Sequence, residues 1–189
     1  MTDSAGHPEP VMQPAEQPAK QPAQQPAKPT SRSRSIMTEL VFPGDTNHHG
    51  TMFGGTLMQY IDKIAAIAAM RHCNRPVVTA SSDSLDFLSP IRVGEAMELE
   101  AFVTWTHRSS MEVYVSVTAE NLFTEERRTT VTAFSTFVAL DDKGKPTPVP
   151  PVAPDSDLAR RLHASAPERH ALRMKRRQQR YSSTDGEAR

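Results

Sequence analysis

The sequence of 189 residues has one cysteine, no net charge, few aromatic residues and no long apolar run. The single cysteine, Cys73, excludes an internal disulfide and a metal site built from several thiolates, and it is typical of a reducing compartment. No apolar run reaches the roughly 18 to 20 residues that cross a bilayer, and the N-terminus lacks the charged start and apolar block of a secretory signal. We therefore expect a cytoplasmic protein without a membrane span.

The zero net charge is the sum of three unlike segments. Residues 1–35 hold 4 basic and 3 acidic side chains, residues 36–154 hold 9 and 14, and residues 155–189 hold 9 and 5. Neutralisation of phosphates by Lys and Arg supplies most non-specific affinity for nucleic acids, so the acidic middle segment makes nucleic acid an unfavoured partner. Only the basic C-terminal segment leaves that option open.

Proline marks the limits of the folded part. Seven of the 16 prolines fall within the first 30 residues, and residues 13–28 repeat Gln-Pro-Ala four times with almost nothing apolar to bury. We therefore expect residues 1–35 to form a disordered tail. Prolines crowd again after Pro146, which predicts a folded domain over residues 36–154. Residues 155–189 are then a basic tail that could be helical from Asp157, although Pro167 interrupts that helix.

The middle segment predicts one long helix and five strands. Residues 56–73 contain no glycine or proline and are rich in Leu, Met, Ile and Ala, which favours a helix. Strand-like patterns occur at 38–42, 77–88, 96–106, 111–122 and 129–140. Short turns between the last four make them antiparallel. A helix that is apolar nearly all round must be surrounded by protein, so we predict an α+β hot-dog domain in which a curved antiparallel five-stranded sheet wraps a long central helix. An ordinary sheet-plus-helix fold is the alternative.

Asp62 is the candidate catalytic residue. It lies about two turns into the apolar helix and shares a face with Ala65, Ala66 and Ala69, which leave room beside it. A carboxylate in apolar surroundings is suited to general-base catalysis. The alternative is a carboxylate that pairs with a basic group or faces solvent beside Lys63.

Gly54 and Gly55 precede this helix and suggest a second element of the site. Free N–H groups and the dipole at a helix N-terminus favour negative charge, and such donors can form an oxyanion hole. Two glycines alone usually mean only a tight turn. Gly55 and Asp62 lie roughly 10 Å apart along one helix, too far to act on the same carbonyl. We therefore expect a homodimer with its sites at the subunit interface.

The sequence from about residue 37 to 154 resembles the acyl-CoA thioesterase family of the hot-dog fold. The resemblance is carried by the loop and helix TNHHGTMFGGTLMQYIDKIAAIAA, by TASSDSLDFLSP, by THRSSMEVYVSVTAEN and by FSTFVALDDKGKPTPVPPV. The pattern NHHGT-x-FGG with an aspartate seven residues after the second glycine is specific to that family. TAS-x-D-x-x-x-F-x-x-P is an independent match.

The resemblance implies roles for residues of the loop and the helix. Asp62 corresponds to the catalytic aspartate, which acts as a general base on water or as a nucleophile, and the amides of Gly54 and Gly55 polarise the thioester carbonyl. Thr51 stands where two-domain vertebrate relatives have an asparagine that acts from the opposite domain. Its hydroxyl either donates to water or caps the turn, while Asn47 keeps an amide near the chemistry.

The resemblance also implies where the substrate binds. Relatives place CoA against the sheet and the turn between the third and fourth strands, which contains Arg108, Ser109 and Ser110. Arg108 could meet a phosphate, and the serine hydroxyls could bind nearby. An ordinary polar hairpin is the alternative. Ser84 and Phe87 are predicted to line the acyl channel, or else to be core and edge residues.

The implied function is hydrolysis of acyl-CoA to a free acid and CoA in fatty acid metabolism. No metal or other cofactor is expected, because CoA is part of the substrate and product and the adjacent His48 and His49 lack the usual spacing of a ligand pair. The family tends toward trimers of dimers or tetramers, so a homo-oligomer is implied. The alternative is a non-catalytic acyl-CoA-binding regulator with the same fold, whose basic tail contacts a nucleic acid or membrane.

Overall fold

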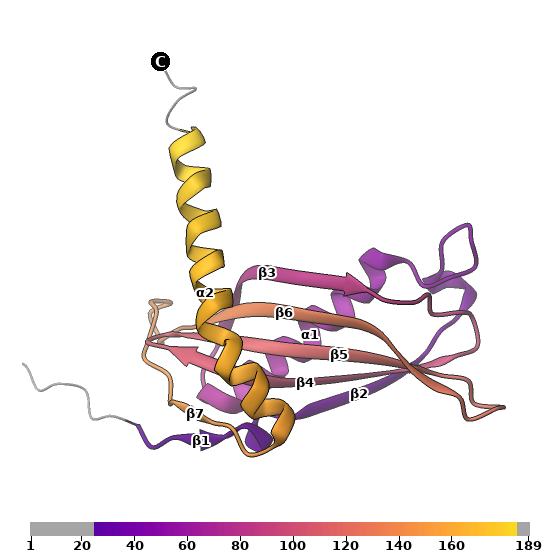
Figure 1. The fold of residues 1–189 in the computed structure, drawn as a ribbon, viewed down its shortest axis with the longest axis horizontal. Coiled ribbons are helices and arrows are strands. Elements are labelled where there is room, and N and C mark those ends of the chain that lie inside the picture. Colours follow the sequence, from indigo (N-terminus) through magenta and orange to yellow (C-terminus); the bar gives the residue numbers. More distant parts are fainter. Residues whose placement is uncertain (1–24, 185–189) are drawn as a thin grey trace, which may run out of the picture.

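The structure is a computed structural model that describes residues 25–184, with side chains to residue 179 (Figure 1). It contains two long helices, five long strands and several short elements. In chain order these are β1 (Lys28–Pro29), η1 (Thr30–Arg32), β2 (Ser35–Leu40), η2 (Pro43–Asp45), α1 (Gly54–Cys73), β3 (Val77–Phe87), β4 (Ala96–His107), β5 (Ser110–Glu120), β6 (Arg127–Ala139), β7 (Val152–Ala153) and α2 (Asp157–Thr184).

The long strands form one antiparallel sheet in the order β2-β4-β5-β6-β3, and β1 pairs in parallel with β7. One line of paired residues crosses four strands as Met37, Leu99, Val117 and Val131, and the last three are fully buried. This line shows how the predicted alternation directs one face of each strand into a common core. The predicted α+β hot-dog fold is confirmed.

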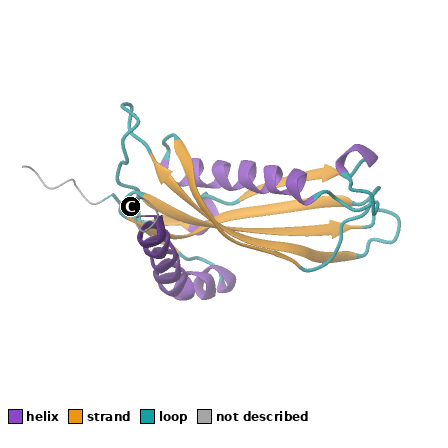
Figure 2. Ribbon diagram, turned by 90° about the horizontal axis from the view of Figure 1, so that it is seen from above, coloured by secondary structure: helices purple, strands orange, loops and turns teal. Residues whose placement is uncertain are grey.

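The sheet lies between the two helices (Figure 2). Helix α1 packs on one face through Leu57, Ile64, Ala65 and Ala68, each at most 2% exposed. The alanines allow the helix to approach the sheet closely, since they add little side-chain bulk between the backbones. α1 ends at Asn74, which adopts the left-handed conformation (φ 53°) and donates its backbone N–H to Met70 O.

One side of α1 is not covered by the sheet. Met58, Ile67 and Met70 are 47%, 37% and 41% exposed. The prediction that protein surrounds this helix on all sides is therefore wrong for a single chain. A single sheet can cover only the face of a helix that is turned toward it.

The expected disordered tail over residues 1–35 is too long, although residues 1–24 lie outside the described part. Residues 25–35 are folded onto the domain. Lys28 donates its backbone N–H to Pro151 O at 2.8 Å and its Nζ to His72 O at 2.6 Å. Ser33 is fully buried, and its Oγ accepts from the Val103 N–H. These hydrogen bonds to the domain order a segment whose composition has little to bury.

The C-terminal tail is a helix that packs on the outer face of the sheet. α2 continues through Pro167, where we predicted an interruption. Proline removes one helical hydrogen bond, but tertiary contacts can outweigh that loss. Ala159 and Ala166 are only 1% and 0% exposed, and His163 Nδ1 donates to Thr104 O at 2.8 Å.

In residues 25–184, no helix is long and apolar enough to cross a bilayer.

Candidate active site

The N-terminus of α1 presents free backbone donors. Phe53 is the N-cap residue, and its own N–H donates to Asp45 O at 2.8 Å. Leu57 N–H makes the first bond back along the helix, to Phe53 O at 3.0 Å. Gly54 and Gly55 belong to the first turn rather than to the preceding loop, so the helix begins two residues earlier than predicted. Their amides point out of the helix end, where they can stabilise negative charge.

Two phenylalanines lie against these glycines. A Cβ on Gly55 would come within 2.8 Å of Phe53 Cε1, and a Cβ on Gly54 would lie 3.5 Å from Phe87 Cζ. The aromatic residues are themselves 55% and 57% exposed. Phe87, which was predicted to line the acyl channel, thus lies beside the predicted oxyanion donors. An apolar rim surrounds the end of the helix.

Asn47 and Thr51 hold the preceding loop closed. Asn47 Nδ2 donates to Thr51 Oγ1 at 3.1 Å, and Asn47 Oδ1 accepts from the backbone N–H of His49 at 2.9 Å. The backbone N–H of Asn47 donates to Thr51 O at 2.9 Å, and Gly50 completes the turn with a φ of 70°. The side chains of Asn47 and Thr51 thus bind one another. This contact fits turn capping, which is one of the two roles expected for Thr51.

Asp62 is exposed in the single chain. Its Oδ1 accepts a hydrogen bond of 2.8 Å from Thr79 Oγ1, which belongs to β3. The apolar surroundings predicted for this carboxylate are therefore absent in one chain, because this side of α1 is turned away from the centre of the sheet. The sequence pattern indicates no role for Thr79, although this residue begins the TAS-x-D-x-x-x-F-x-x-P motif. A hydroxyl on an edge strand carries no signal of its helical partner.

The remaining candidates lie elsewhere. Arg108, Ser109 and Ser110 are at the hairpin of β4 and β5, and Ser110 pairs with Val138, which in turn pairs with Val78 at the start of β3. Phe87 ends that strand about 25 Å away, at roughly 3.3 Å per residue with an allowance for bulges. In one chain the predicted CoA-binding turn and the helix N-terminus are therefore at opposite ends of the sheet.

Ser84 is on the wrong face to line a channel beside Asp62. It pairs with Phe134, whose ring is covered by the Arg169 guanidinium of α2 at 4.1 Å. Ser84 therefore faces the outer side of the sheet, where it lines a cavity of about 580 Å³ beside α2. Ser84 and Phe87 are three residues apart in a regular part of β3, so strand alternation places them on opposite faces and they cannot both line a channel on the α1 side. No group of three or more His, Cys, Asp or Glu that could hold a metal occurs in residues 25–184.

Known proteins share this sequence and this fold. The family model described as the thioesterase superfamily matches residues 49–122. YkhA of Bacillus subtilis, named as an uncharacterized acyl-CoA thioester hydrolase, is 52% identical over 145 residues, which are 77% of this chain and 84% of that protein.

Solved structures are similar over most of the chain. An apo-hexameric acyl-CoA thioesterase has a TM-score of 0.79 and 55% identity, over 80% of this chain and 97% of its own. An acyl-CoA hydrolase of Staphylococcus aureus, solved with butyryl coenzyme A and coenzyme A, has a TM-score of 0.83 and 44% identity, over 87% of this chain and 100% of its own. The same enzyme was solved with alanine replacing an aspartate, a threonine or an asparagine. The chain described here therefore belongs to the thioesterase superfamily and is one of its hot-dog members.

Proposed function

We propose that this protein hydrolyses the thioester of acyl-CoA to a free carboxylic acid and CoA, with Asp62 as the catalytic carboxylate. The observation that carries the proposal is the hydrogen bond from Thr79 to Asp62, which fixes the carboxylate on the exposed side of α1. The names of the relatives support the substrate class.

The relatives also support the choice of residues. In the S. aureus enzyme, the replaced aspartate follows the replaced asparagine by 15 residues and precedes the replaced threonine by 17. Asn47, Asp62 and Thr79 have the same spacing in this chain. Asp62 and Thr79 bind one another, and Asn47 holds the loop before α1 through Thr51 and His49.

The chemistry needs only a base and an oxyanion hole. Because Thr79 donates to Oδ1, Oδ2 of Asp62 remains free to take a proton from water. The resulting hydroxide attacks the thioester carbonyl, and the negative charge that develops on its oxygen is stabilised by amides at an α1 N-terminus. Collapse of the intermediate breaks the carbon–sulfur bond, and CoA leaves as the thiolate. Attack by the Asp62 carboxylate itself, followed by hydrolysis of the anhydride, is the other route.

The site needs two chains. Gly55 and Asp62 are about 10 Å apart along one helix, so the amides must come from a second copy. Met58, Phe53, Phe87 and Leu88 are exposed apolar side chains at this end of the molecule. A second chain that covers them would also supply the apolar surroundings expected for the carboxylate. We therefore propose a homodimer, assembled further into a tetramer or a trimer of dimers, and two similar structures are hexameric.

Replacement of Asp62 by the isosteric asparagine tests the proposal. Asp62→Asn should fold and assemble normally, because Asn can still accept from Thr79. Its turnover should fall about 10²- to 10⁴-fold, measured as CoA release with a thiol reagent on acyl-CoAs from acetyl to stearoyl. Thermal unfolding and oligomeric mass are the controls. Undiminished turnover on every substrate would remove Asp62 from the mechanism.

The same assay distinguishes a non-catalytic acyl-CoA-binding regulator. Such a protein would bind CoA but release no more thiol than the Asp62→Asn variant. A cytoplasmic location and a part in fatty acid metabolism also remain proposals, and the buried free thiol of Cys73 is compatible with the former. Nucleic acid is an unfavoured partner, because Arg169 and Arg173 of the basic helix are used in ion pairs with the sheet.

A further inference from the structure

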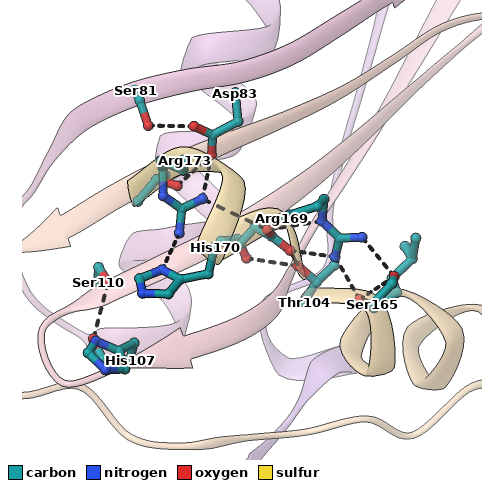
Figure 3. Close-up of polar contacts among 12 residues, drawn as sticks. Ser81, Asp83, Thr104, His107, Ser110, Ser165, Arg169, His170 and Arg173 are labelled. Atoms are coloured by element: carbon teal, nitrogen blue, oxygen red, sulfur yellow. Dashed lines mark hydrogen bonds and ion pairs between the residues drawn. The ribbon is translucent and has the colours of Figure 1, made fainter. Parts of the chain in front are cut away.

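A buried ionic network joins α2 to the outer face of the sheet (Figure 3). Glu112 of β5 is fully buried and accepts from Arg169 Nη2 at 2.7 Å and from Thr104 Oγ1 at 2.7 Å. Asp83 of β3, whose side chain is 6% exposed, accepts from Arg173 Nη1 at 2.7 Å. Buried charges of this kind are tolerated only when they are paired, so the two arginines hold two carboxylates in place.

Asp83 also binds residues of the sheet itself. Its Oδ1 accepts from Ser81 Oγ at 2.7 Å, and its Oδ2 accepts from Thr136 Oγ1 at 2.7 Å. Its backbone carbonyl accepts from Arg176 Nη1 at 3.1 Å. Asp83 thus links α2, the edge strand β3 and the neighbouring strand β6. One carboxylate connects three elements on the face opposite α1.

The strand β3 is irregular at this point. Thr79 pairs with Phe137 and Ser81 with Thr136, so Ala80 is an extra residue, and Asp83 is a second extra residue between Ser82 and Ser84. In a regular strand, residues two apart face the same side. Because of the bulge at Ala80, Thr79 faces Asp62 of α1 while Ser81 faces Asp83 on the opposite side of the sheet.

Hydrogen bonds to a neighbouring strand hold this part of β3 from one side only. Among the strands that the structure describes, β3 lies at the edge of the sheet and pairs with β6 alone. A slip of one residue in its register would reverse the side of the sheet that Thr79 faces. The contacts of Asp83 with Ser81 and Thr136 oppose such a slip, because they join the bulged residues to β6. The ion pair with Arg173 holds the Asp83 carboxylate in position to make these contacts.

We propose that Arg173 and Asp83 are positioning residues, which hold the bulge of β3 so that Thr79 orients the Asp62 carboxylate. This inference rests on the proposed function of Asp62. It makes the C-terminal helix a part of the catalytic unit, although α2 lies on the opposite face of the sheet from the carboxylate.

The test compares Arg173→Ala with Arg173→Lys in the full-length protein. Small misplacement of a catalytic group by a distant change costs up to about 10²-fold, so we expect Arg173→Ala to lower kcat about 10- to 100-fold. KM should change by less than about threefold if Arg173 acts only through Asp83 and Thr79. Arg173→Lys should recover most of the loss. Arg160→Ala, which removes the exposed ion pair with Asp157 on the same helix, is the matched control and should keep its activity.

A double-mutant cycle with Thr79→Val separates positioning from simple loosening of α2. If Arg173 acts through Thr79, Arg173→Ala should cost less than about twofold in kcat once the Thr79 hydroxyl is gone. An equal loss in both backgrounds would overturn the inference and leave Asp62 as the catalytic group. Undiminished kcat in Arg173→Ala would overturn it too. Failure of Asp62→Asn to lower turnover would instead remove the proposed function on which it rests.

Discussion

His72 is a fully buried imidazole in the last turn of α1. Its Nε2 lies 2.9 Å from Pro150 O, so that nitrogen carries a proton and donates it, whereas Nδ1 has no partner. Burial is the main cause that lowers the pKa of His72 from its ordinary 6.5, and the nearby charge of Lys28 lowers it further, against the opposing hydrogen bond to Pro150. The folded protein therefore holds His72 in its neutral form.

This burial predicts a loss of stability in mild acid. Below the ordinary pKa the unfolded chain binds a proton at His72 that the folded chain does not, so the free energy of unfolding should fall as pH falls through that range. We expect a steeper fall between about pH 7 and about pH 5 in the wild type than in His72→Gln. Urea unfolding at several pH values measures both slopes. Equal slopes would show that His72 is not the group responsible.

Individual residues differ in how far sequence could predict them. Asp62 and Gly54 stand out in the sequence because a carboxylate in an apolar helix and a glycine before it are unusual. Thr79 does not, since a threonine on a strand gives no sign of the helical residue that its hydroxyl contacts. Ser84 lies three residues before Phe87, so alternation alone would have placed the two on opposite faces. The bulge that directs Ser81 away from Thr79 could not be predicted. A bulge depends on long-range pairing and has no reliable local signal.

At the scale of an element, the N-terminus of α1 has a backbone conformation that tolerates proline. Phe53 is extended, with φ −70° and ψ 126°, as a residue before proline prefers, and Gly54 is the first helical residue, where proline is favoured. Gly54→Pro should therefore remove one amide donor and leave the helix intact. A substituent on Gly54 also has space, because its Cβ would lie at ordinary contact from Phe87.

We expect Gly54→Pro to lower kcat about 10²- to 10³-fold, the usual cost of one lost oxyanion donor. Gly54→Ala keeps the N–H while adding the Cβ, so it serves as the control and should lose far less. Turnover of acyl-CoA and thermal unfolding of both variants give the comparison. If the two variants were equally active, the Gly54 amide would have no part in the reaction.

Elements were predicted well where periodicity is strong. The predicted strands and helix agree with β2 to β6 and α1 to within a few residues at each end. The errors lie in segments whose order comes from contacts with the rest of the molecule. Lys28 is fixed by the backbone of Pro151 and His72, and α2 is fixed by Glu112 and Asp83 despite Pro167. The amino-acid composition of these two segments gives no sign of either set of contacts.

At the scale of the whole molecule, the single chain has an incomplete site. Its carboxylate is exposed, its apolar rim at Phe53 and Phe87 is open to solvent, and its free amides lie about two helix turns from Asp62. These features have one common explanation if the catalytic unit is a dimer. The sequence indicated this through the distance between Gly55 and Asp62 alone.

Mixing two inactive variants tests the shared site most directly. Asp62→Asn and Gly54→Pro chains, co-expressed with different tags, should form hybrid dimers in which one of the two sites has both an intact carboxylate and an intact amide. Random pairing makes half of the dimers hybrid, so the mixture should regain about one quarter of the wild-type turnover. Activity of the mixed sample that stays at the mean of the two parent variants would show that Asp62 and Gly54 act from the same chain, which contradicts the account.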